Sequence, residues 1–463
     1  MMSSQNWNRL RGLWTMGLLS GFFLMIPAMQ AAESDAVTYQ VGAAKIDITP
    51  TRPVLLSGYA ARKHDLKVDV AHPLFARAVV FGGDDQEPRV LVVVDTCGVP
   101  ESLQRSIAAE VEKRHHIPRG HFTLAATHTH GAPMLTGVLE NLLIRDLSAA
   151  ERAAVDGYTQ DLREKVLAVI AEALAQRKPS RLRYGVGEVD FAFNRRRGPV
   201  VDHALPVLVV EDLEGQPHAI LTGYACHCVA ASNGEQITGD WAGVAAAVIE
   251  RDFPQVTALV LAGCGGDQNP RDKGGIPAAE RQGGELAAEV KRVAQGELQP
   301  VDGPLQSKFA EIELPLQELP SEETWQGRAE QPGITGHHAK RNLDRLSQGE
   351  SLPTKVNYPI QSWAFGEDLT MVFLGGEVVV DYALAIKKEF ESDRVWITAY
   401  ANDVACYIPS ERVLKEGGYE GGGAMVWYDQ PAHLKPGLEA LILDEVRAQL
   451  KAMNRSPVSE PSD

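Results

Sequence analysis

The chain has 463 residues, of which 44% are hydrophobic and 23% are charged. These fractions are close to those of an average soluble globular protein, which excludes a disordered chain, a collagen and a multi-span membrane protein. Acidic residues outnumber basic ones by 61 to 45, so the formal net charge is −16. A negative protein repels a phosphate backbone, and nucleic acid is therefore excluded as the main partner.

The first 32 residues have the pattern of a secretory signal peptide. Arg9 and Arg11 precede the apolar run 13–26, and small residues up to Ala32 offer a cleavage site. The run is shorter than the ~20 residues that a spanning helix needs, so an uncleaved membrane anchor is the less favoured alternative. We expect export to the periplasm or secretion, with no transmembrane segment in the mature chain.

The mature chain alternates strand-like and helix-like runs. Strand patterns cover 89–95, 121–130, 182–190, 205–211, 217–225 and 256–263, and helical patterns cover 102–115, 150–177, 243–252 and 279–296. The polar stretch 316–357, with repeated Pro and Gly, predicts an excursion before a hairpin at 359–377. We predict an α/β fold in which one catalytic domain, residues 38–452, has a mixed sheet flanked by helices, followed by a disordered tail at 453–463.

The five cysteines are too few, and odd in number, for a disulfide scaffold. Each follows or interrupts an apolar run, which predicts that all five are buried small residues. A metal site at Cys226 and Cys228 is the alternative, although a second cysteine pair of this kind does not occur.

Two histidines close the strand-like run at 121–130. His128 and His130 are separated by one residue, and on a strand such residues point to the same face, so their imidazoles can converge on a metal ion. Two structural histidines are the alternative. The metallo-β-lactamase pattern requires further ligands where 131–133 reads Gly-Ala-Pro, which disfavours that family. An amidohydrolase barrel stays open.

Other polar residues also follow apolar runs. His227 follows 217–225, a Gly-rich turn with Asp267 and Asn269 follows 256–263, and Glu377 follows the hairpin. The free backbone N–H groups of such a turn can bind a ligand oxygen. The alternative is that the glycines are there only because a tight turn needs residues with positive φ. Three imidazoles and one carboxylate at the ends of apolar runs predict a catalytic zinc centre with its site at strand ends.

Seven segments together resemble the catalytic domain of the neutral/alkaline ceramidases, over roughly residues 38–450. They are THTHG at 127–131, NRRRG at 194–198, YACH at 224–227, GCGGDQNP at 263–270, GGE at 375–377, ANDVACY at 401–407 and YEGG at 419–422. Members of that family are zinc amidases that cleave the N-acyl bond of ceramide and release a fatty acid and sphingosine. The resemblance implies the same class of reaction here.

The resemblance also implies a ligand set, in which zinc is bound by His128, His227, Glu377 and Tyr407. Two neutral imidazoles and one carboxylate leave the site at a charge of +1, whereas an ionised tyrosine would cancel it and weaken the metal as a Lewis acid. We therefore expect Tyr407 to be a weak, neutral donor. A water activated by the metal would attack the amide carbonyl.

Three further residues match family positions that line the site. The resemblance places His130 beside the metal, where it bonds the water or the amide oxygen of the substrate. It makes Arg195 and Tyr419 candidates for stabilising a tetrahedral oxyanion. A surface arginine and a loop tyrosine are the alternatives.

Two departures from the family pattern bear on the mechanism. Where ceramidases carry serine in a GDxSP turn, this chain has Asn269, so no serine nucleophile is expected there and Asp267 and Asn269 are assigned to orienting substrate or holding the turn. After Gly423 only one helix-like stretch, 436–450, follows, where ceramidases append a β-sandwich.

We predict an amide hydrolase acting on a ceramide-like lipid or another small N-acyl substrate. The alternative is a non-catalytic protein that binds a lipid or glycan on the same scaffold.

Overall fold

The computed structural model describes residues 38–83, 87–196, 198, 200–232, 234–390 and 392–457. The predicted signal peptide and the end of the predicted tail lie outside these ranges and stay predictions. Within them, no helix combines the length and the apolar composition that a membrane crossing requires. The described residues group as one compact unit.

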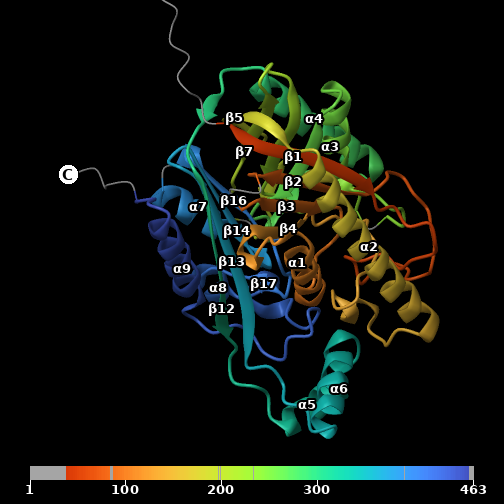
Figure 1. Ribbon diagram of the computed structural model, residues 1–463. Coiled ribbons are helices and arrows are strands. Elements are labelled where there is room, and N and C mark those ends of the chain that lie inside the picture. Colours follow the sequence, from red (N-terminus) through yellow and green to blue (C-terminus); the bar gives the residue numbers. More distant parts are fainter. Residues whose placement is uncertain are drawn as a thin grey trace, which may run out of the picture. The chain divides into compact units, whose positions relative to one another are not determined.

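The larger sheet, part of which is labelled in Figure 1, consists of nine strands by its hydrogen-bonded pairing. Its spatial order is β4-β3-β2-β1-β5-β7-β8-β9, and β11 pairs with β5. The strands are β1 (Tyr39–Asp47), β2 (Phe75–Phe81), β3 (Arg89–Val94), β4 (Phe122–Ala126), β5 (Lys178–Glu188), β7 (Ala204–Asp212), β8 (Pro217–Tyr224), β9 (Thr257–Ala262) and β11 (Gln299–Val301). The pairs β3–β4 and β8–β9 are parallel and the others antiparallel, which confirms the predicted mixed α/β fold.

A second sheet packs on the first. Its order is β12-β13-β14-β16, and two short ladders, β15–β17 and β10–β6, lie apart from both sheets. The strands are β6 (Ala192–Asn194), β10 (Gln268–Pro270), β12 (Leu305–Pro315), β13 (Lys355–Phe365), β14 (Leu369–Leu374), β15 (Glu377–Val378), β16 (Val395–Thr398) and β17 (Tyr407–Ile408). A cluster of buried side chains from both sheets, including Leu208, Trp363 and Phe373, fills the space between them.

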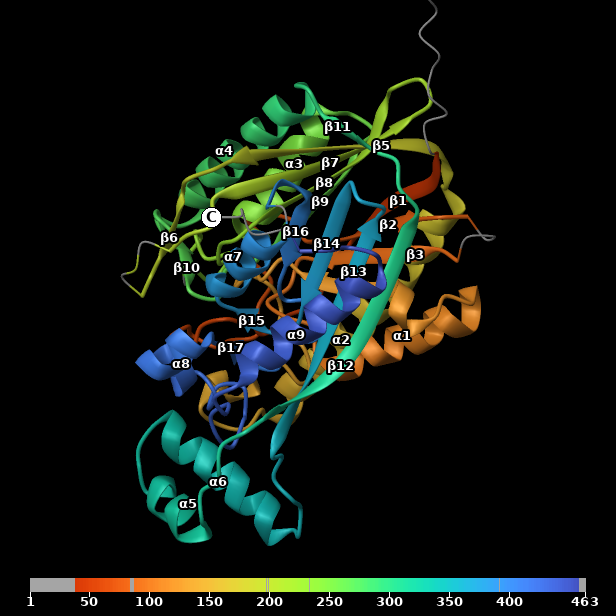
Figure 2. The same cartoon turned by 90° about the vertical axis from the view of Figure 1, so that its left-hand side faces the viewer.

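Several helices cover the outer faces of the two sheets. The α-helices of the described residues are α1 (Glu101–His115), α2 (Ala149–Ala175), α3 (Asp240–Asp252), α4 (Ile276–Ala294), α5 (Glu322–Ala329), α6 (Ile334–Ser347), α7 (Val380–Glu389), α8 (Glu411–Glu416) and α9 (Leu438–Ala452). Helices α3 and α4 share a core with β7, β8 and β9, and α2 packs on β1 and β2. On the opposite side α9 lies against β12 and β13 (Figure 2).

The predicted excursion at 316–357 contains two helices that the sequence pattern did not reveal. Ser321 caps α5 by accepting a hydrogen bond from the Thr324 amide, and Trp325 is fully buried in a small cluster between α5 and α6. One large apolar side chain among polar ones is a weak periodic signal. The pair projects beyond the ends of β12 and β13 (Figure 2).

The carboxyl ends of three strands from the two sheets meet at one place. The Ala399 amide, just after β16, donates to the Ala262 carbonyl at the end of β9 at 2.9 Å, and the Ala126 amide at the end of β4 donates to the Tyr400 carbonyl at 3.1 Å. The segment after β16 therefore bridges β9 and β4, which are the two ends of the larger sheet. The segments that leave these strands carry the candidate site.

Candidate metal centre

Three predicted ligands come together in the buried interior. Glu377 Oε2 lies 3.2 Å from His128 Nε2 and 3.1 Å from His227 Nε2. All three side chains are buried, and their donor atoms lie within 4.8 Å of one another. His128 follows β4, His227 follows β8 and Glu377 opens β15, so three strand ends supply one candidate metal group.

Backbone carbonyls orient both imidazole rings. His128 Nδ1 is 2.6 Å from the Cys97 carbonyl oxygen, and His227 Nδ1 is 2.6 Å from that of Gly265. Because a carbonyl only accepts, each Nδ1 carries a hydrogen, and in the neutral ring the Nε2 lone pair is left for a ligand. The Tyr400 ring stacks on His128 at 4.3 Å and restricts its rotation. The rings are thus preset in the orientation that metal ligation needs.

The Glu377 carboxylate has one engaged and one free oxygen. The Tyr428 hydroxyl donates to Oε1. Oε2 faces the two Nε2 atoms and has no hydrogen-bond donor among the described residues when both rings are neutral and carry their hydrogen on Nδ1. Leaving a buried carboxylate oxygen without a donor is costly, and a cation between Oε2 and the two Nε2 atoms removes that cost. The donor set, two imidazoles and one carboxylate, suits zinc.

The pKa shifts of Glu377 and His128 also indicate that a positive charge is stabilised between these side chains. Burial opposes ionisation of Glu377, but the adjacent His128 and His227 hold the pKa of its carboxyl well below its usual range. Burial likewise opposes a charge on His128, yet Glu377 is the main influence that raises the pKa of His128 to about 10. A proton on His128 and a metal ion therefore compete for one position.

Tyr407 lies at the edge of this group. The parallel pairing of β15 with β17 sets Glu377 opposite Tyr407. The Tyr407 hydroxyl is 3.1 Å from His227 Nε2, and Arg195 Nη2 donates to it at 3.0 Å. Burial and the nearby Glu377 raise the pKa of Tyr407 well above its usual value, which keeps the hydroxyl neutral in this environment.

Arg195 and Tyr419 both lie beside Tyr407. Arg195 Nε donates to Glu420 Oε1 at 2.6 Å, and the Tyr419 ring centroid is 5.3 Å from that of Tyr407. Tyr419 is 46% exposed and begins the Gly-rich turn Tyr419–Gly423, which is kinked at Gly422, where φ is 148°. Arg195 therefore lies inside the site, and Tyr419 forms part of its exposed rim.

His130 lies beside the cluster, but a turn after β4, not the strand that was predicted, brings it there. Strand β4 ends at Ala126, and His128 has a left-handed backbone with φ 60°, so the expectation that the two histidines share one face of a strand is wrong. The turn nevertheless brings His130 Nε2 to 3.0 Å from His128 Nε2. Burial, together with His128 and His227, lowers the pKa of His130 well below its usual value, so this ring stays neutral.

The Gly-rich turn after β9 supports the ligands. Asp267 is fully buried, and its carboxylate accepts hydrogen bonds from the Val380 amide at 2.9 Å and Asn194 Nδ2 at 2.8 Å. Of the two roles predicted for Asp267, the geometry supports holding the turn. At Gly266 a Cβ atom would lie 2.6 Å from the Glu377 carbonyl oxygen, so only glycine permits this approach. Asn269 Oδ1 is 3.5 Å from Arg195 Nη1 and borders the site.

Comparison with known proteins places this arrangement in a family. The sequence profile of the N-terminal region of neutral/alkaline non-lysosomal ceramidases matches residues 39–276. The chain belongs to the neutral/alkaline non-lysosomal ceramidase family. No curated protein matches it.

Solved ceramidase structures share the fold. A ceramidase complexed with C2 is 19% identical, with a TM-score of 0.67 over 92% of this chain and 77% of that chain. A neutral ceramidase from Pseudomonas aeruginosa is 20% identical, with a TM-score of 0.67 over 93% and 76%. The amidohydrolase-barrel alternative is wrong, because most strand pairs are antiparallel and the strands form two packed sheets rather than a parallel barrel.

The sequence patterns did not identify three residues that contact the ceramidase-family site. Tyr400 stacks on His128, Tyr428 donates to Glu377, and Glu420 pairs with Arg195. YEGG contains Glu420, which offered a signal, whereas no motif contained Tyr428. The cysteines are free and buried, as predicted, and the candidate metal groups in the described residues do not include Cys226 or Cys228.

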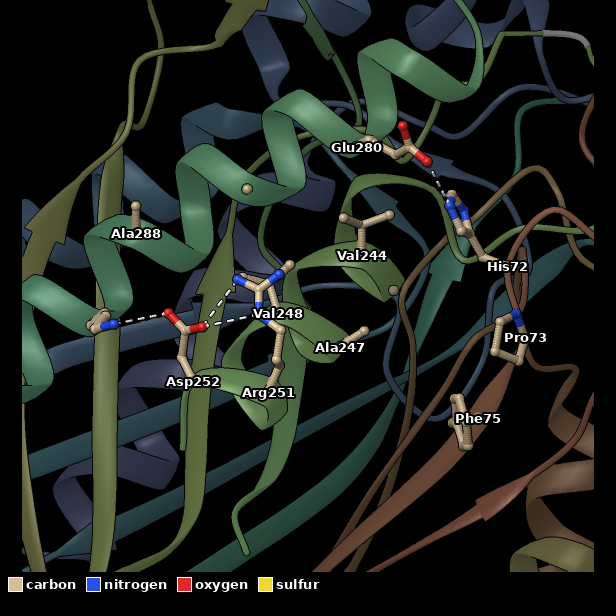
Figure 3. Close-up of a pocket in the computed structure, with 13 residues that line it drawn as sticks. His72, Pro73, Phe75, Val244, Ala247, Val248, Arg251, Asp252, Glu280 and Ala288 are labelled. Atoms are coloured by element: carbon tan, nitrogen blue, oxygen red, sulfur yellow. Dashed lines mark hydrogen bonds and ion pairs between the residues drawn. The ribbon is translucent and has the colours of Figure 1, made fainter. Parts of the chain in front are cut away.

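A separate pocket of about 680 Å³ lies between α3 and α4 (Figure 3). Its lining combines small and apolar side chains, such as Val244 and Ala247, with Arg251 and Asp252 near one end and Glu280 near the other. None of the candidate ligands lines it. The candidate metal centre and this pocket are therefore separate sites.

Proposed function

We propose that the protein is an exported, zinc-dependent amide hydrolase that cleaves the N-acyl bond of a ceramide-like lipid or another small N-acyl substrate. The observation that carries the proposal is the buried set of Nε2 atoms of His128 and His227 facing Glu377 Oε2, an oxygen without a hydrogen-bond donor. Family membership supports amide hydrolysis as the reaction class.

His128, His227 and Glu377 would hold zinc strongly, with the neutral Tyr407 hydroxyl as a weak fourth donor. Zinc at this position supplies Lewis-acid activation of a water molecule and polarisation of an amide carbonyl. The Nδ1 bonds of both histidines to backbone carbonyls keep the ligands in place through the reaction.

The remaining residues act on the substrate and on protons. His130 Nε2 lies 3.0 Å from His128 Nε2, so its imidazole adjoins the ligands and can take a proton from the attacking water and return it to the departing nitrogen. Arg195, held by Glu420, brings a fixed positive charge to the site and can stabilise the oxyanion together with the Tyr419 hydroxyl. Asn269 lies close enough to Arg195 to orient the acyl group.

The test combines metal analysis with a substrate panel. Purified protein should carry one zinc per chain and should hydrolyse a member of a panel of N-acyl lipids and N-acyl sugars. His128→Ala should lose both properties, whereas His218→Ala should keep them, because His218 lies at the far end of β8 and bonds Ser180. Metal-free protein without turnover of any amide would contradict the proposal and favour the non-catalytic binding protein.

Export is tested on the native N-terminus. The pattern of residues 1–32 favours cleavage before a mature chain that starts near Ala32 or Glu33. N-terminal sequencing of protein from the periplasm or medium should find that start. Soluble cytoplasmic protein that retains Met1 would contradict export.

A further inference from the structure

Tyr428 contacts the carboxylate on which the proposed metal centre depends. Its hydroxyl donates to Glu377 Oε1, and its ring lies edge-on to the Tyr407 ring, with centroids 6.1 Å apart. The two oxygens of Glu377 are therefore unequal: Tyr428 occupies Oε1, and Oε2 alone faces the imidazoles.

The segment that carries Tyr428 is anchored from outside the site. Arg341 and Arg345 of α6 both pair with Asp429 Oδ2, Arg341 at 3.3 Å. From the other side, Asn141 Nδ2 donates to the Val426 carbonyl at 2.8 Å and to Asp429 Oδ1 at 3.3 Å. These two ion pairs and two hydrogen bonds hold the segment on both sides of Tyr428.

This anchoring gives the α5–α6 excursion a role in the site. Arg341 and Arg345 are only partly exposed, at 24% and 30%, and Asp429 is 21% exposed, so solvent screens these pairs only in part. The buried Trp325 holds α5 against α6 and so fixes the helix that presents the two arginines. The excursion can thereby act on Glu377 through the segment that contains Tyr428.

We propose that Tyr428 is a positioning residue that restricts Glu377 to a single metal-facing oxygen, and that α6 keeps it in place through Asp429. The inference rests on the proposed function, because it assumes a metal at Glu377. A carboxylate whose second oxygen is held elsewhere ligates through one oxygen only, which preserves an open coordination position for water or substrate. Without the Tyr428 hydroxyl, Oε1 would be buried without its donor and the carboxylate would be free to rotate.

The experiment compares metal binding by wild type and Tyr428→Phe, with Tyr158→Phe as the matched control. Tyr158 is also a buried tyrosine, but its hydroxyl donates to the Ile48 carbonyl at 3.0 Å, away from the site. Zinc affinity is measured by competition with a chelator, and the visible absorption of bound Co²⁺ reports the ligand arrangement. Tyr428→Phe should raise the zinc dissociation constant about 10–100-fold, the range typical of residues that orient metal ligands.

The cobalt spectrum of Tyr428→Phe should also change, whereas Tyr158→Phe should match wild type in both measurements. An unchanged zinc affinity in Tyr428→Phe would overturn the inference. So would a weaker affinity with a wild-type cobalt spectrum, since that result assigns Tyr428 to general stability. Wild-type protein that binds neither metal would instead contradict the proposed function.

The part assigned to α6 has its own variant. Arg345→Met removes one cation from Asp429 and leaves Tyr428 itself intact. It should weaken zinc binding in the same direction as Tyr428→Phe, by a smaller factor, and shift the cobalt spectrum the same way. Wild-type affinity and spectrum in Arg345→Met would overturn the role of α6.

Discussion

Replacing His130 with alanine separates the ligands from the residue that moves protons. His130 Nε2 lies 3.0 Å from His128 Nε2, but Oε2 of Glu377 contacts His128 and His227 at 3.2 and 3.1 Å without it. The backbone bonds of residue 130, from its amide to the Cys228 carbonyl and from Arg62 to its carbonyl, survive in alanine. We therefore expect His130→Ala to fold and to retain zinc.

The expected loss is in the chemical step. A positioned general acid–base group contributes about 10²–10⁴-fold, which at about 1.4 kcal/mol per tenfold is about 3–5 kcal/mol of transition-state stabilisation. The lost contact with Tyr59, whose ring centroid is 4.8 Å away, should cost stability of about 0.5–3 kcal/mol, the usual range for a single substitution. These two effects are measured independently.

The assay pairs zinc content and thermal unfolding with kcat and KM on the best amide of the panel. His218→Ala is the control, because it removes an imidazole far from the site. The prediction is a large fall in kcat at full zinc occupancy. Loss of zinc from His130→Ala would refute the reasoning and make both histidines of the pair ligands. Wild-type kcat would refute the proton-transfer role.

Four further outcomes are expected. Tyr407→Phe should keep zinc, since it removes only a neutral hydroxyl, and metal analysis that found none would make Tyr407 an essential ligand. Glu420→Gln should lower kcat about 10-fold with zinc retained, because it weakens the ion pair that orients Arg195. An unchanged kcat would show that Glu420 is not needed to position Arg195. With Asn269 in place of serine no acyl-enzyme should form, so trapping an acylated side chain after rapid quenching would contradict direct attack by water. Zinc at about 1,000 times its dissociation constant should stabilise the fold by about 4 kcal/mol, and a melting temperature unaffected by chelation would argue against the site.

Much of the fold was predictable because its strands are buried on both faces. The runs at 89–95 and 256–263 are continuous apolar segments and correspond to β3 and β9 within a residue or two at each end. Helices α5 and α6 were not predicted, because the buried side chains of α5 are Trp325 and Ala329 alone, and α6 buries no large apolar side chain. The left-handed turn at His128 was equally hidden, since His128 adopts it without a glycine signal.

The site was predictable only as far as local patterns reach. His227 and Glu377 could be singled out because each follows an apolar run, and Tyr407 came from the family resemblance. Tyr428 lies 51 residues from Glu377 in the chain, and their contact depends on how α6 anchors the segment after the turn Tyr419–Gly423. Such a pairing is set by tertiary packing, and nothing in the residues around position 428 encodes it locally.

Anomalous diffraction at the zinc edge, from crystals of the zinc-loaded protein, locates the metal. We expect one strong peak at coordination distance, about 2.0–2.2 Å, from His128 Nε2, His227 Nε2 and Glu377 Oε2. The same peak should disappear in His128→Ala. A fully occupied zinc at any other place in the chain, or no anomalous peak at this cluster in zinc-loaded crystals, would contradict the proposed metal site.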